Sequence, residues 1–532
     1  MTTSAEAELG DDAAATPPRT PARARLARAC VLFAVFVCAA CGLVYELALV
    51  ALGSYLIGDT IGQASIVLSL MVFAMGVGAL TAKPLQRWAA EAFAAIEILL
   101  ALIGGLSVLV LYAAFAWLSL YMPALIATAL VLGVLIGAEI PLLMVLLQRI
   151  RQQDAGSAVA DLFAADYVGG LLGGLAFPFV LLPLFGQIHG ALFVGMLNAA
   201  AGLGLVLTVF RRELSRRAMA ILVALSVLVA AALGGAAAYA EDFEVTARQA
   251  LYADPVLHAE RTPYQQIVLT QSPGFGAGDT RMFLNGDLQF SSVDEYRYHE
   301  ALVHPAMSGP RKRVLVLGGG DGLGVREVLR YPDVEEVTLV ELDPAVVDLA
   351  REHPSISRLN DHAFDDPRVT TVAADAFEWL RENRDRFDVV LVDMPDADST
   401  ATAKLYSTEF YGLVRHAMAD GARLNVQAGS PFFAPQAYWC VEATMRSAGL
   451  STVPFEVTVP SFGEWGFHLA QAGGTPPLRL PDDAPPLRSL DPPTLRAAAT
   501  FPPDRARIPG MEPSTLMHPT ILDHARGEWT NY

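Results

Sequence analysis

The first 240 residues of this 532-residue chain consist largely of apolar stretches separated by short polar links. A helix needs about 20 apolar residues to cross the hydrocarbon core of a bilayer, and we identify seven stretches of that order. They predict a multi-pass α-helical domain in the cell (inner) membrane. The predicted spans cover residues 30–56, 64–82, 94–118, 122–147, 159–186, 189–210 and 218–240.

The basic residues around these spans predict their orientation. The polar leader, residues 1–27, lacks a small-residue cleavage site, so the first span is interpreted as an anchor and not as a removed signal peptide. Arg and Lys recur in every second link, which places the N-terminus in the cytoplasm. Seven spans then put the residues after 240 on the other side, unless a re-entrant fifth stretch restores an even number. The basic residues are Arg19, Arg23, Arg25, Arg28, Lys83, Arg87, Arg149, Arg151, Arg211, Arg212, Arg216 and Arg217.

Five carboxylates fall within the predicted spans, where a charge is costly unless it is neutralised, paired or hydrated. Glu97 and Asp161 are expected near the membrane interface, whereas Glu46 and Glu139 lie deeper. Asp166 precedes a Gly-rich segment that is broken by a proline. Such a segment favours close helix packing, and a broken helix lining a cavity is the alternative. Glu46, Glu139 and Asp166 are therefore candidates for an intramembrane cation site.

Charge and cysteine content exclude other classes of function. The formal net charge of -18 argues against a nucleic-acid partner, which requires a basic surface. An acidic surface suits cationic partners, or simply keeps the protein soluble. Cys38 and Cys41 form a C-x-x-C sequence inside the first span, but no second pair accompanies it. We therefore predict no metal site.

Beyond residue 240 the pattern changes to short strand-like runs separated by turns. Residues 265–270 and 282–290 predict a small antiparallel lead-in. From residue 313 apolar strands alternate with helices, which predicts a doubly wound, Rossmann-like α/β sheet of the methyltransferase type. The expected strands are 314–317, 337–342, 369–373, 389–392 and 423–426. The predicted organisation is a leader (1–27), a transmembrane domain (28–240), a β lead-in (251–292), a Rossmann-like domain (293–473) and a Pro-rich tail (474–532).

A Gly-rich turn and several acidic side chains follow the predicted strands. Residues 318–324, Gly-Gly-Gly-Asp-Gly-Leu-Gly, allow the backbone to approach a ligand at a helix N-terminus. Glu341 follows about 20 residues later, a spacing typical of a carboxylate that binds ribose hydroxyls. Asp321 lies inside the turn, where it would repel a pyrophosphate and favour an ammonium; alternatively it caps the next helix. With Asp375 and Ala376 after the third strand, this layout predicts an adenosyl-sulfonium site.

Asp393 and Asp396 stand at the carboxyl end of the fourth strand, the edge where ligands bind in such sheets. A primary amine is protonated at pH 7 and must lose a proton before it can attack. A carboxylate can orient the ammonium group and accept that proton. Asp393 is the predicted base and Asp396 a second contact for the amine, with a loop cap as the alternative role of Asp396.

These motifs together resemble the spermidine synthase (polyamine aminopropyltransferase) family. The resemblance extends from about residue 264 to about residue 467, and several blocks occur in one order. The blocks are Tyr264-Gln265, Leu284-Asn-Gly-Asp-Leu-Gln289, Asp294-Glu-Tyr-Arg-Tyr-His-Glu300 with His304-Pro305, the glycine turn at 318–322, Glu341-Leu-Asp343, Asp375-Ala376, Asp393-Met-Pro-Asp396 and Leu405-Tyr-Ser-Thr-Glu-Phe-Tyr411.

The resemblance implies that decarboxylated S-adenosylmethionine donates its aminopropyl group to a polyamine amine, with release of methylthioadenosine. It implies no permanently bound cofactor and no metal, because the sulfonium is already a good leaving group. The implied nucleoside contacts are Gln265, Glu341, Asp375 and Ala376, the implied aminopropyl and polyamine contacts are Asp321, His299 and Asp396, and the implied base is Asp393.

Putrescine is the expected acceptor, with spermidine as the product. The chain departs from the family at Asn285, Ala397, Thr400 and Phe462, where Asp, Pro, Pro and Tyr are usual. These departures concern the acceptor more than the donor, so a longer polyamine or another amine is the alternative. The lipid bilayer is a further expected partner, and a homodimer is left open.

Two other functions share parts of this pattern. An S-adenosylmethionine-dependent methyltransferase has the same sheet, but methyl transfer needs neither Asp321 nor the pair formed by Asp393 and Asp396. A membrane polyamine transporter or sensor with a binding-only soluble domain would account for Glu46 and Glu139. The side of the membrane is in conflict: the donor is made in the cytoplasm, whereas charge bias with seven spans places the catalytic half outside.

Overall fold

The computed structural model describes residues 21–57, 60–151, 155–211, 214–273, 278–397 and 399–529. The chain forms two compact units, Met1–Leu251 and Tyr252–Tyr532. Arg19 of the leader and Arg212 of the last basic link lie outside the described residues.

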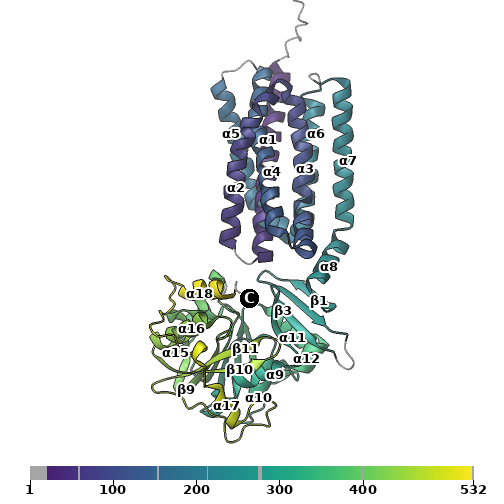
Figure 1. Cartoon of the computed structure of the whole chain (residues 1–532). Helices are drawn as coiled ribbons and strands as arrows, with labels where there is room; N and C mark the ends of the chain where they lie inside the picture. Colours follow the sequence, from purple (N-terminus) through teal and green to yellow (C-terminus); the bar gives the residue numbers. More distant parts are fainter. Residues whose placement is uncertain are drawn as a thin grey trace, which may run out of the picture. The chain divides into compact units, whose positions relative to one another are not determined.

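Within the described residues, the first unit is a bundle of seven long helices followed by a shorter helix, α8 (Figure 1). Its apolar side chains pack into one continuous core. The helices are α1 (Pro21–Ile57), α2 (Thr60–Thr81), α3 (Ala89–Ala113), α4 (Tyr121–Arg151), α5 (Ala155–Ala176), α6 (Leu182–Thr208), α7 (Arg216–Ala238) and α8 (Ala240–Leu251).

Six apolar helical runs in the described part of the chain are long enough to span a bilayer, whereas the sequence predicts seven. The difference arises because the predicted fifth and sixth spans join in one run of 50 residues, Val159–Thr208. At about 1.5 Å per residue such a run would be roughly 75 Å long, more than twice the thickness of a hydrocarbon core. Gly186 interrupts it with a left-handed φ of 68° and a ψ of -174°.

Packing of α5 on α1 shows the direction of the first half of this run. A Cβ atom at Gly169 would lie 2.2 Å from the carbonyl oxygen of Phe36, and one at Gly173 would lie 2.5 Å from that of Ala40. Contacts that advance by four residues on both helices mean that α5 runs parallel to α1. The glycines therefore serve close helix packing, as expected of small residues four apart, and the stretch is a helix that α1 covers along its length.

Packing of α6 on α3 shows that the second half runs the other way. The Asn198 side chain donates a hydrogen bond to the Glu97 carbonyl oxygen. A Cβ atom at Gly195 would lie 2.7 Å from the carbonyl oxygen of Ala101. The contacts move backward on α6 as they move forward on α3. Short links make α1, α2 and α3 alternate in direction, so α3 runs parallel to α1. Because α5 is parallel to α1 and α6 is antiparallel to α3, α5 and α6 are antiparallel to each other. The bundle therefore consists of seven alternating helices.

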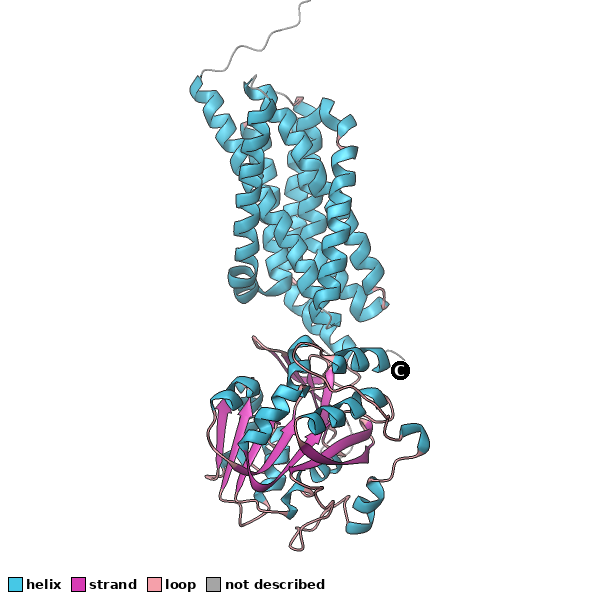
Figure 2. Ribbon diagram, turned by 90° about the vertical axis from the view of Figure 1, so that its left-hand side faces the viewer, coloured by secondary structure: helices cyan, strands magenta, loops and turns pink. Residues whose placement is uncertain are grey.

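The second unit contains a four-stranded antiparallel sheet and a seven-stranded mixed sheet (Figure 2). The small sheet has the order β1-β2-β3-β4 and the large sheet the order β10-β11-β9-β8-β5-β6-β7. Strands β5 to β9 are parallel, whereas β11 pairs with β9 in the antiparallel direction and β10 pairs with β11 in the antiparallel direction. The strands are β1 (Val256–Arg261), β2 (Gln266–Gln271), β3 (Thr280–Leu284), β4 (Asp287–Ser291), β5 (Arg313–Gly318), β6 (Glu336–Glu341), β7 (Val369–Ala373), β8 (Phe387–Asp393), β9 (Met418–Gln427), β10 (Leu450–Val459) and β11 (Gly463–Ala472).

Helices cover both faces of the large sheet, as predicted for a doubly wound fold. Alternating residues of β5 enter different cores: Val314 and Val316 pack in one, Leu315 and Leu317 in the other. Both faces of a central parallel strand are buried, which is why these strands are continuous apolar runs. The helices of the second unit are α9 (Glu295–Val303), α10 (Leu323–Leu329), α11 (Pro344–Glu352), α12 (Pro354–Leu359), α13 (Ala376–Glu382), α14 (Thr400–Ala403), α15 (Thr408–Ala417), α16 (Pro435–Ser447), α17 (Pro492–Ala498) and α18 (Thr520–Trp529).

Two segments complete the unit. The predicted strand 282–290 is a hairpin, β3–β4, because Asn285 and Gly286 adopt left-handed φ values of 54° and 97°, as a tight two-residue turn requires. The Pro-rich tail packs against the sheet domain: the carboxylate of Glu300 accepts backbone hydrogen bonds from Arg488 and Ser489, and Leu495 is fully buried.

Candidate active site

The parallel strands end at a common edge, which carries the predicted site residues. Gly318 at the end of β5 pairs with Asp393 at the end of β8, and Glu341 at the end of β6 pairs with Ala373 of β7. The glycine turn follows β5 directly, and the Gly319 N–H donates to the Asp393 carbonyl oxygen over 3.1 Å. The turn and the loop after β8 are thus held together by backbone contacts.

Asp393 is half-buried at the end of β8, and its carboxylate accepts a hydrogen bond of 2.5 Å from the Tyr298 hydroxyl on α9. Burial and the charge of the nearby Asp321 carboxylate raise the pKa of Asp393, while His299 and the Tyr298 hydroxyl oppose the rise, and the net pKa is about 6. Such a carboxylate is largely ionised at neutral pH and is still basic enough to accept a proton, as a general base must.

Asp321 and His299 lie beside Asp393. The Asp321 carboxylate accepts a hydrogen bond of 2.8 Å from the Leu323 N–H, so it combines the turn-capping role with a place at the site. Burial raises its pKa, and the His299 charge opposes that rise. Burial disfavours the charged form of His299, but hydrogen bonding to Glu295 and the charges of Glu295, Asp321 and Asp393 together raise the pKa of the imidazole.

His299 is oriented by a buried ion-pair network. Its Nδ1 lies 2.9 Å from a carboxylate oxygen of Glu295, and the same carboxylate pairs with the guanidinium of Arg326 at 2.9 Å. Glu295 and His299 are both on α9, four residues apart, whereas Arg326 belongs to α10. One ring nitrogen is therefore committed to Glu295, and only the other is free to meet a substrate.

The predicted ribose ligand, Glu341, is half-buried next to the glycine turn. Burial raises its pKa to about 7, while backbone N–H groups oppose the shift. Its neighbour Asp343 accepts hydrogen bonds from Thr262 (2.7 Å) and from the Gln265 side chain (3.1 Å). Gln265, on the lead-in, is thereby brought to the same strand end as Glu341.

Asp375 and Ala376 lie at the start of α13. Asp375 caps this helix through the Phe377 N–H at 2.8 Å and forms an ion pair of 2.6 Å with Lys404. Burial opposes the charge of Asp375, but Lys404 and the backbone N–H groups lower its pKa. Both carboxylate oxygens thus have partners, so a nucleoside contact here would share them or displace the Lys404 ammonium.

Asp396 follows β8 and faces the β9–β11 side of the sheet. The Gln427 amide lies 3.4 Å from its carboxylate, and the Trp465 indole N–H donates to the Gln427 amide oxygen over 3.3 Å. The Phe462 ring lies 5.2 Å from the Trp465 ring and 6.2 Å from the Tyr298 ring, centroid to centroid. This region combines a carboxylate with aromatic faces, a combination suited to an alkyl ammonium chain.

Tyr298 and Asp343 lie at the site but were not among the residues predicted from the sequence. Tyr298 belongs to the Asp294–Glu300 block, and its contact with Asp393 spans 95 residues of sequence. Asp343 follows Glu341 in the block that suggested a ribose contact, but its bonds to Thr262 and Gln265 come from the lead-in. A polar residue directly after the predicted strand 337–342 is the signal that could have identified Asp343.

In the helical unit, the three intramembrane candidates do not form one site. Glu139 is buried close to Cys38 and Glu97, and Asp166 is near enough to interact with the Glu139 charge. Glu46 is half-buried on α1, eight residues beyond Cys38, which corresponds to about 12 Å along a helix. Glu97, which the sequence predicts near the membrane interface, is fully buried in the bundle.

Comparison with known proteins agrees with this geometry. Residues 295–478 match the spermine/spermidine synthase domain. The chain is 59% identical to polyamine aminopropyltransferase 1 of Streptomyces coelicolor, over 98% of this chain and 99% of that one. It is 46% identical to the polyamine aminopropyltransferase of Mycobacterium tuberculosis, over 94% and 97% of the two chains.

Among solved structures, spermidine synthase from Thermotoga maritima matches with a TM-score of 0.37 and 23% identity, over 52% of this chain and 87% of that one. The similarity to the two aminopropyltransferases extends over nearly the whole length, including the helical unit. The chain therefore belongs to the polyamine aminopropyltransferase (spermidine synthase) family.

Proposed function

We propose that the second unit transfers the aminopropyl group of decarboxylated S-adenosylmethionine to a primary amine of a polyamine, with Asp393 as the general base. The observation that carries this proposal is the half-buried Asp393 carboxylate beside a second carboxylate, the buried Asp321, at the edge that holds the glycine turn. Two neighbouring acids suit a pair of cationic substrates, and a methyltransferase has no use for them.

In the proposed reaction, the amine nitrogen attacks the aminopropyl carbon that is bonded to sulfur. The C–N bond forms as the C–S bond breaks, and the sulfonium leaves as neutral methylthioadenosine. The ammonium proton is transferred to Asp393, whose pKa of about 6 keeps it ionised at neutral pH. Asp321 and the free ring nitrogen of His299 would position the aminopropyl chain and the acceptor.

Putrescine is the acceptor that we propose, with spermidine as the product. Asp396 would bind the distal ammonium group of the diamine, and the aromatic rings of Phe462 and Trp465 would line its alkyl chain. Asn285, one of the departures from the family, has a structural explanation: it forms the β3–β4 turn, and its side chain accepts the Gln266 N–H over 3.0 Å. It therefore says little about the acceptor.

The test is a turnover assay with the purified full chain, decarboxylated donor and a panel of amines, in which methylthioadenosine is measured. We expect release with putrescine, and Asp393→Asn should lower kcat by at least about 100-fold while the Kd for the donor, measured by calorimetry, changes little. Asp385→Asn is the matched control, because that side chain is 67% exposed on the surface. An unchanged kcat in Asp393→Asn would exclude Asp393 as the base, and methyl transfer from intact S-adenosylmethionine would overturn the reaction.

We also propose that α1–α7 cross the bilayer seven times, with the N-terminus in the cytoplasm. Support comes from the apolar helices, the reversal at Gly186 and the alternating basic links. An odd number of crossings requires that reporters fused before α1 and after α7 read opposite sides of the membrane in cells. Reporters that read the same side would contradict seven crossings, and protease treatment of sealed vesicles would identify the side that holds the second unit.

A further inference from the structure

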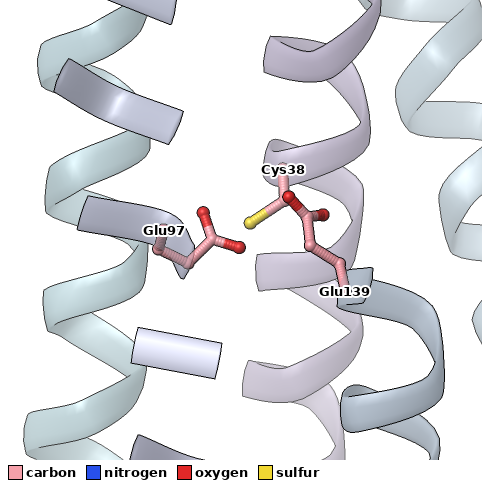
Figure 3. Close-up of side chains that lie close together, drawn as sticks. All are labelled: Cys38, Glu97 and Glu139. Atoms are coloured by element: carbon pink, nitrogen blue, oxygen red, sulfur yellow. The ribbon is translucent and has the colours of Figure 1, made fainter. Parts of the chain in front are cut away.

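Three side chains from three helices meet in the interior of the helical unit. Cys38 of α1, Glu97 of α3 and Glu139 of α4 each offer one ligand atom, and these atoms all lie within 4.8 Å of one another. Figure 3 shows the Cys38 sulfur and the two carboxyl groups directed toward a common point. All three residues are buried, with exposed fractions of 3%, 0% and 6%.

The Glu97 carboxylate indicates that this cluster lacks a ligand. Among the described residues, neither of its oxygens has a partner in hydrogen-bond geometry, although the Asn198 side chain is near and the carboxylate is fully buried and aimed at Cys38 and Glu139 (Figure 3). A buried polar group without a partner destabilises the fold, and a charged one does so more strongly. A second carboxylate at this distance adds repulsion. A cation between the three side chains would relieve both costs.

We propose that Cys38, Glu97 and Glu139 bind a single divalent transition-metal ion of the zinc class inside the helical unit. A thiolate and two carboxylate oxygens form a donor set that Zn²⁺ and related ions accept, at about 2.0–2.3 Å from each ligand atom. Three protein ligands leave a fourth position for water or another group.

The sulfur distinguishes this ligand from an organic cation. An ammonium group would be held by oxygen acceptors, whereas a cysteine sulfur accepts hydrogen bonds only weakly. A thiolate is in contrast a strong ligand for soft and borderline metals. Metal binding would also supply positive charge that the cluster lacks and would release the thiol proton to solvent or to a neighbouring base.

The C-x-x-C spacing does not indicate this site, because Cys38 and Cys41 do not share partners. Cys41, the second cysteine of the C-x-x-C sequence, points elsewhere: its sulfur lies 3.9 Å from the Val194 carbonyl oxygen on α6. The partners of Cys38 come instead from α3 and α4, far away in the sequence. Nothing in the spacing of the cysteines could reveal them.

Co²⁺ is the probe for the test, because a thiolate bound to Co²⁺ gives a charge-transfer absorption in the near ultraviolet that carboxylates do not give. The full chain is purified in detergent with a chelator, the chelator is removed, and Co²⁺ is titrated in, followed by competition with Zn²⁺. We expect one Co²⁺ per chain, the sulfur band, and its loss when Zn²⁺ displaces Co²⁺.

Cys38→Ser should abolish the sulfur band, and Glu97→Gln and Glu139→Gln should each weaken binding by at least about 10-fold. Cys41→Ser and Glu46→Gln are the matched controls and should leave the band unchanged, since one faces α6 and the other lies about 12 Å along α1. Methylthioadenosine release by every variant reports whether the second unit is folded.

Three results would overturn the proposal. These are absence of the sulfur band in the wild-type chain, a band that persists in Cys38→Ser, and displacement of Co²⁺ by millimolar putrescine but not by Zn²⁺. The last result would assign the cluster to an organic ammonium ion. Because the wild-type titration alone can refute a metal site, the test does not depend on the folding of any variant.

Discussion

Replacing Tyr298 with Phe removes one hydrogen bond, the 2.5 Å bond that its hydroxyl donates to the Asp393 carboxylate. The ring itself remains and can still pack at 5.3 Å from Phe467. The hydroxyl donates to the ionised form of Asp393, so this bond lowers the pKa of the carboxyl group. Its loss must raise that pKa above the present value of about 6.

The size of the shift follows from the strength of the bond. A hydrogen bond to a charged group contributes about 1.5–3 kcal/mol, and one pKa unit corresponds to about 1.4 kcal/mol. We therefore expect the pKa of Asp393 to rise by about 1–2 units, to about 7–8. The ionised fraction at pH 7 then falls from roughly nine-tenths to between one-half and one-tenth, since each unit is a tenfold change in the equilibrium.

The assay is the pH dependence of kcat/KM for the wild type and for Tyr298→Phe, between about pH 5.5 and pH 9. The variant should be about 2- to 10-fold slower at pH 7 and should approach the wild type above about pH 9, where Asp393 is ionised in both. Protonation of the amine substrate affects both enzymes equally, so the ratio of the two profiles isolates the enzyme group. Tyr331→Phe is the control, because that buried hydroxyl bonds to His304 at 2.6 Å and not to the site.

Two results would refute the reasoning. If the two profiles have the same shape and differ by a constant factor, Tyr298 positions the substrate or Asp393 and does not set the pKa. If Tyr298→Phe shifts the acidic limb to lower pH, the sign of the electrostatic argument is wrong.

Two further predictions concern the glycine turn and a buried carboxylate. Gly318→Ala should lower kcat/KM at least about 10-fold, because φ is 80° and the new Cβ would lie 2.1 Å from the Asp393 carbonyl oxygen. The control is Gly412→Ala on α15, where no described atom lies within 4 Å of the new Cβ. This variant should keep full activity and stabilise the chain by up to about 1 kcal/mol. Equal activities in the two variants would show that the turn does not position Asp393. Burial disfavours the charge of Glu327, but His304, Arg326 and Arg330 lower its pKa to about 2. The stability that the ionised carboxylate contributes is therefore present above about pH 4.5 and is lost as the pH falls toward about 2. Glu327→Gln should therefore reduce the free energy of unfolding of the second unit by roughly 3 kcal/mol at pH 7 and by much less near pH 2 in denaturant titrations; a loss independent of pH would contradict the ion-pair explanation.

The strands of the parallel sheet could be predicted because their environment leaves a strong pattern. Val314 to Leu317 are buried on both faces, so the run is wholly apolar, and a carboxylate or glycine at its end is conspicuous. The β10–β11 hairpin was not predicted. Its residues are only partly buried along β10, and Pro454 interrupts the run, so the alternation that identifies a strand is weak there.

The sequence alone determined the division into an apolar and a catalytic half and the chemistry expected at the strand ends. Hydropathy and strand-end residues are local properties, and the physical demands of a bilayer or a buried sheet act on each segment separately. Asp393, Asp321 and Glu341 could be assigned in this way.

Only the tertiary structure decided which side chains from distant segments meet. The contact of Tyr298 with Asp393, the orientation of His299 by Glu295 and Arg326, and the meeting of Cys38 with two glutamates depend on how helices rotate and pack. Hydropathy shows that Glu97 belongs to an apolar helix, but not which face of that helix is turned inward. That rotation places Glu97 at the centre of the bundle, opposite a cysteine almost sixty residues earlier in the chain.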